Sequence, residues 1–198
     1  MRRTAITLIA LGTAMLVAAG CGQFGKRYSP EKKQSDTKVI STKPFDAAAR
    51  KAGGCGTIET VKVTGRGDHS TSLDEKIKYS VNPPTSGRHY QTPLDWGVYD
   101  TEERTEKFVH NQEHGHIVIT YKGLTGAEKQ QLLSYVQRDP FHLVVLPRSK
   151  NPKNGVYLTS WEGRLYCRKP SAPALQEFVK QYRDQGPELF MNDPKKKD

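Results

Sequence analysis

The sequence predicts a single α+β domain over residues 55–190, with a mixed or antiparallel sheet, helices packed on one face and one disulfide. This region is long enough for one compact core, and neither a repeat nor a second linker divides it. Strand-like and helix-like patterns follow one another in the order strand, helix, strand, strand, helix. Two cysteines, Cys55 and Cys167, lie far apart within it.

The first part of the domain carries the weaker patterns. Thr57–Val63 alternates apolar and polar residues and predicts a strand, and a second short strand is predicted over Ile77–Val81. The acidic residues at 100–103 favour the start of a helix. We therefore expect a short helix over 102–114, ended by Gly115, although a loop fits the same residues.

The second part is clearer. Ile117–Tyr121 is a nearly continuous β-branched run, which is typical of a central strand, and a helix over Thr125–Arg138 follows it. Phe141–Leu146 and Val156–Cys167 indicate two further strands, joined by a turn rich in asparagine and glycine. The last predicted element is an amphipathic helix over Pro173–Gln185.

The N-terminal region has the pattern of an export signal. Residues 1–20 begin with two arginines and continue as an apolar stretch too short for a stable membrane span. Small residues precede Cys21 and resemble the lipobox of bacterial lipoproteins, which implies cleavage before Cys21 and a lipid on its thiol. We expect an extracytoplasmic protein anchored to a bacterial membrane, with residues 21–54 as lipidated cysteine and flexible tether and residues 191–198 as a basic tail. An ordinary cleavage site with an incidental cysteine is the alternative.

Export bears on the remaining cysteines and on the charge. With Cys21 carrying the lipid, Cys55 and Cys167 are left in an oxidising compartment, and we expect them to pair. Closing a loop of about a hundred residues contributes on the order of 4 to 5 kcal/mol in the chain-entropy model. Without residues 1–20 the chain keeps 29 basic and 21 acidic residues, a net charge of +8. These charges are scattered and form no nucleic-acid motif, so no nucleic-acid partner is expected.

Four of the six histidines lie in two short motifs between residues 82 and 116. His110 and His114 are four residues apart, which places them on one face of a helix, with Glu113 beside them. His89 follows a proline-rich loop and could approach this pair from the other side. Three imidazoles and a water would form an open site for zinc or copper. Alternatively, these histidines bond to the backbone in a rigid loop core.

Other polar residues near these motifs have supporting roles in this hypothesis. Three residues are expected to orient the ligands through hydrogen bonds without contacting the metal: Glu113, His116 and Tyr90. His69, in a turn, and His142, beside a phenylalanine, are expected to face solvent or to be structural. Because imidazole must be neutral to bind a metal, metal affinity is expected to fall between about pH 7 and pH 5.

Several motifs of this domain are also found together in a known family. They are Asn82–Tyr90 (NPPTSGRHY), Gly97–Tyr99, Val109–Gly115 (VHNQEHG), Thr159–Trp161 with Cys167, and the closing Phe178 to Glu188. With them the chain resembles the bacterial exported proteins grouped as domain of unknown function 3105, over residues 55–190. His89, His110, Glu113 and His114 fall on the motif positions of the family. Arg88 stands where the family usually has proline. The resemblance implies a site at this place and no particular activity.

Three functions follow from these observations. The first is a non-catalytic metal-binding lipoprotein that holds copper or zinc through His89, His110 and His114. The second is a zinc-dependent hydrolase or peptidase, because residues 110–114 match the pattern H-x-x-E-H, in which Glu113 would activate a zinc-bound water. The sequence favours binding over catalysis, because such enzymes place the motif inside a long helix, whereas a glycine and a strand follow it here.

The third function is a structural lipoprotein that binds an unidentified protein partner. It rests on aromatic residues near the predicted loops, which either form a surface or belong to the core. They are Tyr90, Trp96, Tyr99 and Trp161.

Overall fold

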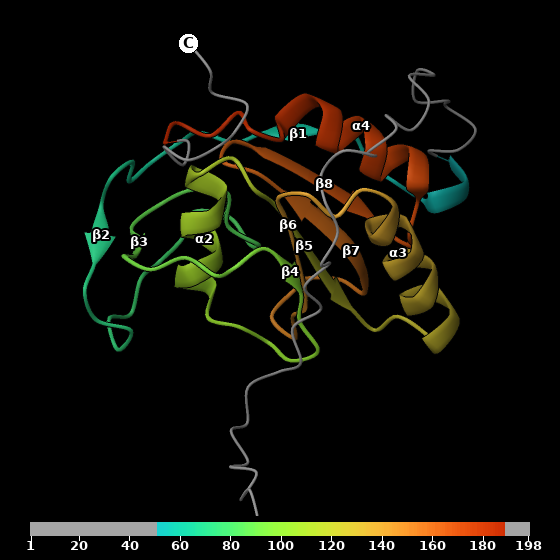
Figure 1. Cartoon of the computed structure of the whole chain (residues 1–198), viewed down its shortest axis with the longest axis horizontal. Coiled ribbons are helices and arrows are strands. Elements are labelled where there is room, and N and C mark those ends of the chain that lie inside the picture. The colour runs from blue at the N-terminus through green and yellow to red at the C-terminus, as the bar shows by residue number, and fades with distance from the viewer. Residues whose placement is uncertain (1–50, 189–198) are drawn as a thin grey trace, which may run out of the picture.

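The computed structural model describes residues 51–188 (Figure 1). The predicted export signal, Cys21, most of the tether over 21–54 and the basic tail over 191–198 lie outside the described residues. Within residues 51–188, every helix is too short or too polar to cross a membrane.

A six-stranded mixed sheet forms the centre of the domain, with strand order β1-β8-β7-β5-β6-β4. Strand β5 pairs with β6 in parallel and with β7 in antiparallel orientation. All but the last residue of β5 are buried, as expected for the continuous β-branched run in its sequence. The strands are β1 (Glu59–Thr60), β4 (Gly97–Val98), β5 (Ile117–Lys122), β6 (Leu143–Pro147), β7 (Gly155–Thr159) and β8 (Gly163–Cys167). The prediction of an α+β domain with a mixed sheet is confirmed.

Helices α3 (Gly126–Arg138) and α4 (Ala172–Tyr182) pack on one face of this sheet. Helix α3 is the connection between the parallel strands β5 and β6, and it begins at a capping box formed by Thr125 and Glu128. Helix α4 buries one apolar side against the same face, as its helical spacing predicted.

The opposite face of the sheet carries α2 (Thr105–Glu113). Side chains alternate across a strand, so Val118 and Val144 point away from α3 and α4 and pack with Phe108 and Val109 of α2. The helices predicted on one face of the sheet are therefore α3 and α4. Helix α2, which carries the histidine motif, covers the other face, so the domain has three layers. Figure 1 shows α2 and the small strands β2 and β3 on the side of the sheet away from α3.

Three expected strands differ from the structure. The strand predicted over Thr57–Val63 is reduced to Glu59–Thr60, and the one over Val156–Cys167 is a hairpin of β7 and β8. Ile77–Val81 forms no strand. Its alternating exposure is present, but no strand within residues 51–188 pairs with it, and Tyr79 packs against the core cluster.

Helix α2 begins later than the sequence predicted. Its first residue is Thr105, and the acidic residues before it do not form its first turn. Instead, Glu102 accepts hydrogen bonds from the backbone N–H of Ser149 (2.8 Å) and from its hydroxyl (3.1 Å). The acidic segment therefore anchors the chain before α2 to the segment after β6.

The predicted disulfide is confirmed, because Cys55 and Cys167 are bonded across a sequence separation of 112 residues. Cys167 is the last residue of β8 and is buried. The bond joins the segment before β1 to the end of β8, so it fixes the start of the domain onto its sheet.

Candidate metal centre

Two short strands outside the main sheet bring two histidines together. Strands β2 (His69–Ser70) and β3 (His89–Tyr90) pair in parallel, with His69 opposite His89. Paired residues point to the same side of a ladder, and the two imidazole centroids are 4.6 Å apart. The side chain of His89 is fully buried, whereas that of His69 is 33% exposed.

Glycine permits the close approach of the segments that lead into these strands. Gly65 has a φ of +66°, and a Cβ there would lie 2.4 Å from backbone atoms of Gly87 and Arg88. A side chain at residue 65 would therefore separate the chain before β2 from the chain before β3. The backbone N–H of His89 donates to the carbonyl of Asp68 (3.0 Å) and continues this contact into the paired strands.

Helix α2 supplies the other side of the site. His110 and Glu113 are three residues apart and therefore share one face of the helix. Both are buried, and Glu113 has no exposed surface. The helix ends before Gly115, whose φ of +81° turns the chain into β5.

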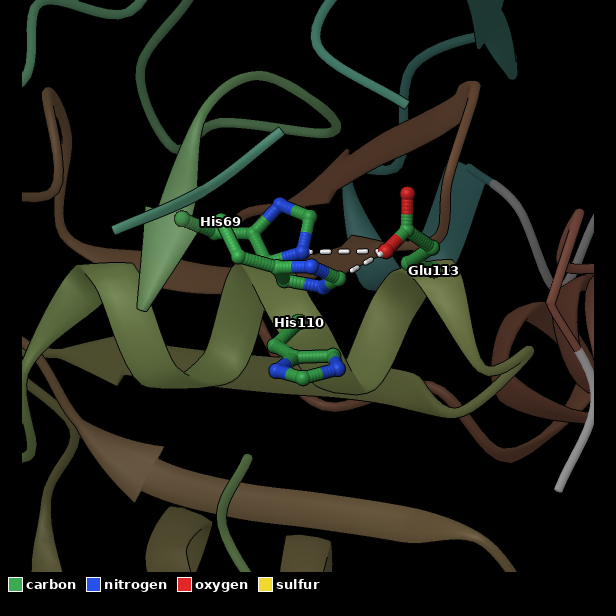
Figure 2. A group of neighbouring side chains, drawn as sticks. His69, His110 and Glu113 are labelled. Atoms are coloured by element: carbon green, nitrogen blue, oxygen red, sulfur yellow. Dashed lines mark ion pairs between the residues drawn. The ribbon is translucent and has the colours of Figure 1, made fainter. Parts of the chain in front are cut away.

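One potential ligand atom from each of His69, His89, His110 and Glu113 lies within 4.8 Å of the others. Figure 2 shows His69, His110 and Glu113 of this group. Glu113 Oε2 is 3.0 Å from His89 Nε2 and 3.4 Å from His69 Nε2. All three atoms are buried, and none of them makes a hydrogen bond within the described part of the chain. A buried polar atom without a partner is costly, so this convergence favours a cation at its centre.

The backbone determines which nitrogen each buried imidazole presents to this centre. The Nδ1–H of His89 donates to the carbonyl of Gly87 (2.7 Å), and the Nδ1–H of His110 donates to the carbonyl of Tyr90 (2.8 Å). A carbonyl only accepts, so each Nδ1 carries the proton and each neutral ring keeps its lone pair on Nε2. Carbonyl-bound imidazoles of this kind are typical of metal ligands.

The electrostatics of the group combine an ionised carboxylate with an uncharged His110. Burial raises the pKa of Glu113, but the neighbouring His89 and the Gly67 N–H, which donates to Oε1 at 2.7 Å, outweigh burial and hold this pKa below its usual value. Burial lowers the pKa of His110 to about 4. Near neutral pH, Glu113 is therefore ionised and His110 uncharged, which suits a positive ion.

His114, the third ligand predicted from the sequence, lies beside this group and not within it. Its Nδ1–H donates to the carbonyl of Glu188, and its Nε2 is 2.8 Å from Nε2 of His110. The segment that holds it packs directly on the end of α2, because the Glu188 N–H donates to the Glu113 carbonyl (3.1 Å). A Cβ at Gly186 would lie 2.2 Å from that same carbonyl oxygen.

His116 takes part in a separate buried network. Its Nδ1 accepts a hydrogen bond from the Asn111 amide (3.0 Å), and its ring stacks on His142 at a centroid distance of 4.5 Å. His142 in turn is 2.6 Å from a carboxylate oxygen of Asp184. Burial lowers the pKa of His116 to about 3. This network joins the start of β5 to the end of α4.

Trp161, Tyr90 and Arg88 lie beside the site without entering it. Trp161 is buried and meets His89 edge-on at a centroid distance of 6.0 Å, and Tyr99 is buried in the same core cluster. Tyr90 orients His110 through its backbone carbonyl. Arg88 forms ion pairs with Asp68 and, at 2.7 Å, with Glu75, so it braces the outer edge of the β2–β3 pair.

The structure thus joins two of the three predicted histidines, His89 and His110, with Glu113 and with a residue that the sequence placed elsewhere, His69. No sequence pattern pointed to His69, because its position depends on the parallel pairing of two-residue strands. Glu113, expected behind the ligands, faces them directly.

Comparison with known proteins leads to one family. A family model described as "Protein of unknown function (DUF3105)" matches residues 70–194, which include every residue of the site except His69. Comparisons with curated proteins and with solved structures found no match. The chain therefore belongs to the DUF3105 family.

Proposed function

We propose that this domain binds one divalent transition-metal ion, zinc or copper(II), through His69, His89, His110 and Glu113, and that the site is not catalytic. One observation carries the proposal. His69 Nε2, His89 Nε2 and Glu113 Oε2 converge, buried and without hydrogen bonds. A cation bound between them satisfies all three atoms at once.

A proton satisfies this arrangement less well than a metal. A protonated His89 could pair with Glu113 Oε2 at 3.0 Å, but His69 Nε2, 3.4 Å from the same oxygen, would still make no hydrogen bond. Three nitrogen ligands and one carboxylate oxygen suit zinc and copper(II), whereas copper(I) prefers sulfur. Three neutral imidazoles and one carboxylate also reduce the charge of a divalent ion to +1.

The arrangement of Glu113 favours binding over hydrolysis. In an H-x-x-E-H enzyme the glutamate activates water and is not itself a ligand. Here Oε1 accepts from the Gly67 N–H and Oε2 faces two imidazoles, so the carboxylate has the position of a ligand. A four-residue ligand set also fills the tetrahedral coordination that a catalytic zinc keeps partly open.

Metal binding can be tested with full-length protein purified without an affinity tag and stripped with a chelator. Titration calorimetry and elemental analysis should give one zinc or copper(II) ion per chain. His89→Gln and Glu113→Gln should weaken binding by about 10-fold or more. His142→Gln is the matched control, because its imidazole pairs with Asp184 outside the group. A wild-type protein that takes up neither ion would refute the proposal.

We further propose that the chain is an exported lipoprotein anchored to a bacterial membrane through Cys21. The small residues before Cys21 support the anchor, and the Cys55–Cys167 disulfide fits an oxidising compartment. Membrane fractionation with mass spectrometry of the N-terminus should find a lipid-modified Cys21 in the membrane pellet. Cys21→Ala should prevent the modification and release the protein, and an unmodified wild-type N-terminus would contradict the anchor.

A further inference from the structure

His110 and His114 form a second pair of convergent nitrogens next to the proposed ion. Each Nδ1–H donates to a backbone carbonyl, that of Tyr90 or that of Glu188. In the neutral rings both lone pairs are therefore on Nε2, and these two Nε2 atoms are only 2.8 Å apart. Two lone pairs at this distance repel unless a cation, either a proton or a metal ion, lies between them.

The spacing of this pair suits a metal ion. Two metal–nitrogen bonds of about 2.0–2.1 Å that span 2.8 Å meet at nearly a right angle, as neighbouring positions do in tetragonal copper(II) coordination. His114 is partly exposed, whereas His110 is buried. An ion held by both residues would therefore lie between solvent and the buried group.

His110 belongs to both arrangements. Its potential ligand atom lies within 4.8 Å of those of His69, His89 and Glu113, and its Nε2 has one lone pair to offer. Two divalent ions beside the single carboxylate of Glu113 would repel each other, so occupation of both positions at once is unfavourable. One ion that moves between them exchanges ligands stepwise and never loses all of its protein ligands.

We propose that His114 and His110 form a loading position, where a zinc or copper(II) ion first binds before it moves to His69, His89 and Glu113. This inference rests on the proposed metal-binding function. In it His114 governs how fast the ion arrives and leaves, whereas the four residues of the group determine how tightly the ion is held.

Stopped-flow fluorescence with copper(II) tests this proposal, because copper quenches tryptophan and Trp161 lies 6.0 Å from His89. Wild type should show two phases, of which the first depends on copper concentration and the second does not. His114→Gln should slow loading and release together, by about 10-fold, and change the Kd by less than about 3-fold. His142→Gln should match wild type, and circular dichroism and thermal melts verify that each variant is folded.

The possible outcomes separate this inference from the function on which it rests. Unchanged loading with faster release and a weaker Kd would make His114 a permanent ligand and overturn the loading role. Unchanged rates in His114→Gln would overturn it as well, because the ion would then reach the group by another route, such as the partly exposed His69 side. A single phase in wild type would by itself overturn the proposal, because it would show no transfer step after the first binding. If wild type binds no metal at all, the proposed function itself fails.

Discussion

The buried, uncharged histidines make the metal-free domain sensitive to acid. Burial is the main reason that the pKa of His116 is lowered to about 3 and that of His110 to about 4. In an unfolded chain the pKa of each histidine is near 6.5. Below pH 6.5 the unfolded chain binds protons that the folded domain excludes. Stability due to these residues is therefore complete above pH 6.5 and is lost as the pH falls.

The size of the loss follows from these pKa values. Each pH unit below 6.5 removes about 1.4 kcal/mol for each such histidine. Between pH 6.5 and pH 4.5, His110 and His116 together should lower the free energy of unfolding by roughly 5 kcal/mol. This loss is comparable with the whole stability of many domains of this size.

Urea denaturation in the presence of a chelator measures this loss directly. The experiment compares wild type with His116→Gln at several pH values between 7.5 and 4.5. The variant should lose about half as much free energy over this range, whatever its stability at pH 7.5. A wild-type free energy that stays within about 1 kcal/mol from pH 6.5 to pH 4.5 would refute the reasoning, as would a variant with the full loss.

Three further predictions follow from the fold and the site. Zinc at about 100 times its Kd should raise the Tm by roughly 8 °C. The shift should fade as the pH falls, because protons and the metal compete for the imidazoles. Burial lowers the pKa of His110 to about 4, so this ligand remains available at pH 6. Melts across pH 4 to 8 measure the range, and a constant shift would exclude histidine ligands. Replacing both cysteines of the Cys55–Cys167 bond by serine should lower the unfolding free energy by about 4–5 kcal/mol in urea; no change would mean that the bond adds no stability. Gly186→Ala should destabilise by roughly 2 kcal/mol or more, since its Cβ would meet the Glu113 carbonyl at 2.2 Å. Gly126→Ala, with nothing within 4 Å, should stabilise by about 0.4–1 kcal/mol, and equal effects of the two would contradict the packing described.

The parts of the fold that the sequence predicted are those with strong local signals. The β-branched run became the buried strand β5, and Thr125 with Glu128 formed the cap that begins α3. Ile77–Val81 alternates in exposure but formed no strand. A strand needs a partner, and local alternation carries no information on whether a neighbouring edge exists.

The same distinction applies to the candidate site. Helical spacing brought His110 and Glu113 onto one face, and this was predictable because the helix repeat is local. His69 joins them only through pairing with His89, twenty positions later in the chain, and through the close approach at Gly65. His114 was expected to be an equal ligand, but its ring is held beside the group by the carbonyl of Glu188. This contact is between residues 74 positions apart, so no local pattern predicts it.

The small parallel pair of β2 and β3 also changes how an ion would act on the chain as a whole. An ion held by His69 and Glu113 would be a reversible crosslink that closes the loop between residues 69 and 113. This loop is nested inside the larger one that the Cys55–Cys167 bond closes permanently. Loss of the ion would remove the inner crosslink and leave this loop held by the β2–β3 pairing and the Gly67 N–H bond to Glu113, while the outer bond still joins Cys55 to β8. Hydrogen exchange of the metal-free protein should therefore be fast around residues 64–75 and remain slow in β5, so the domain responds to metal by local opening.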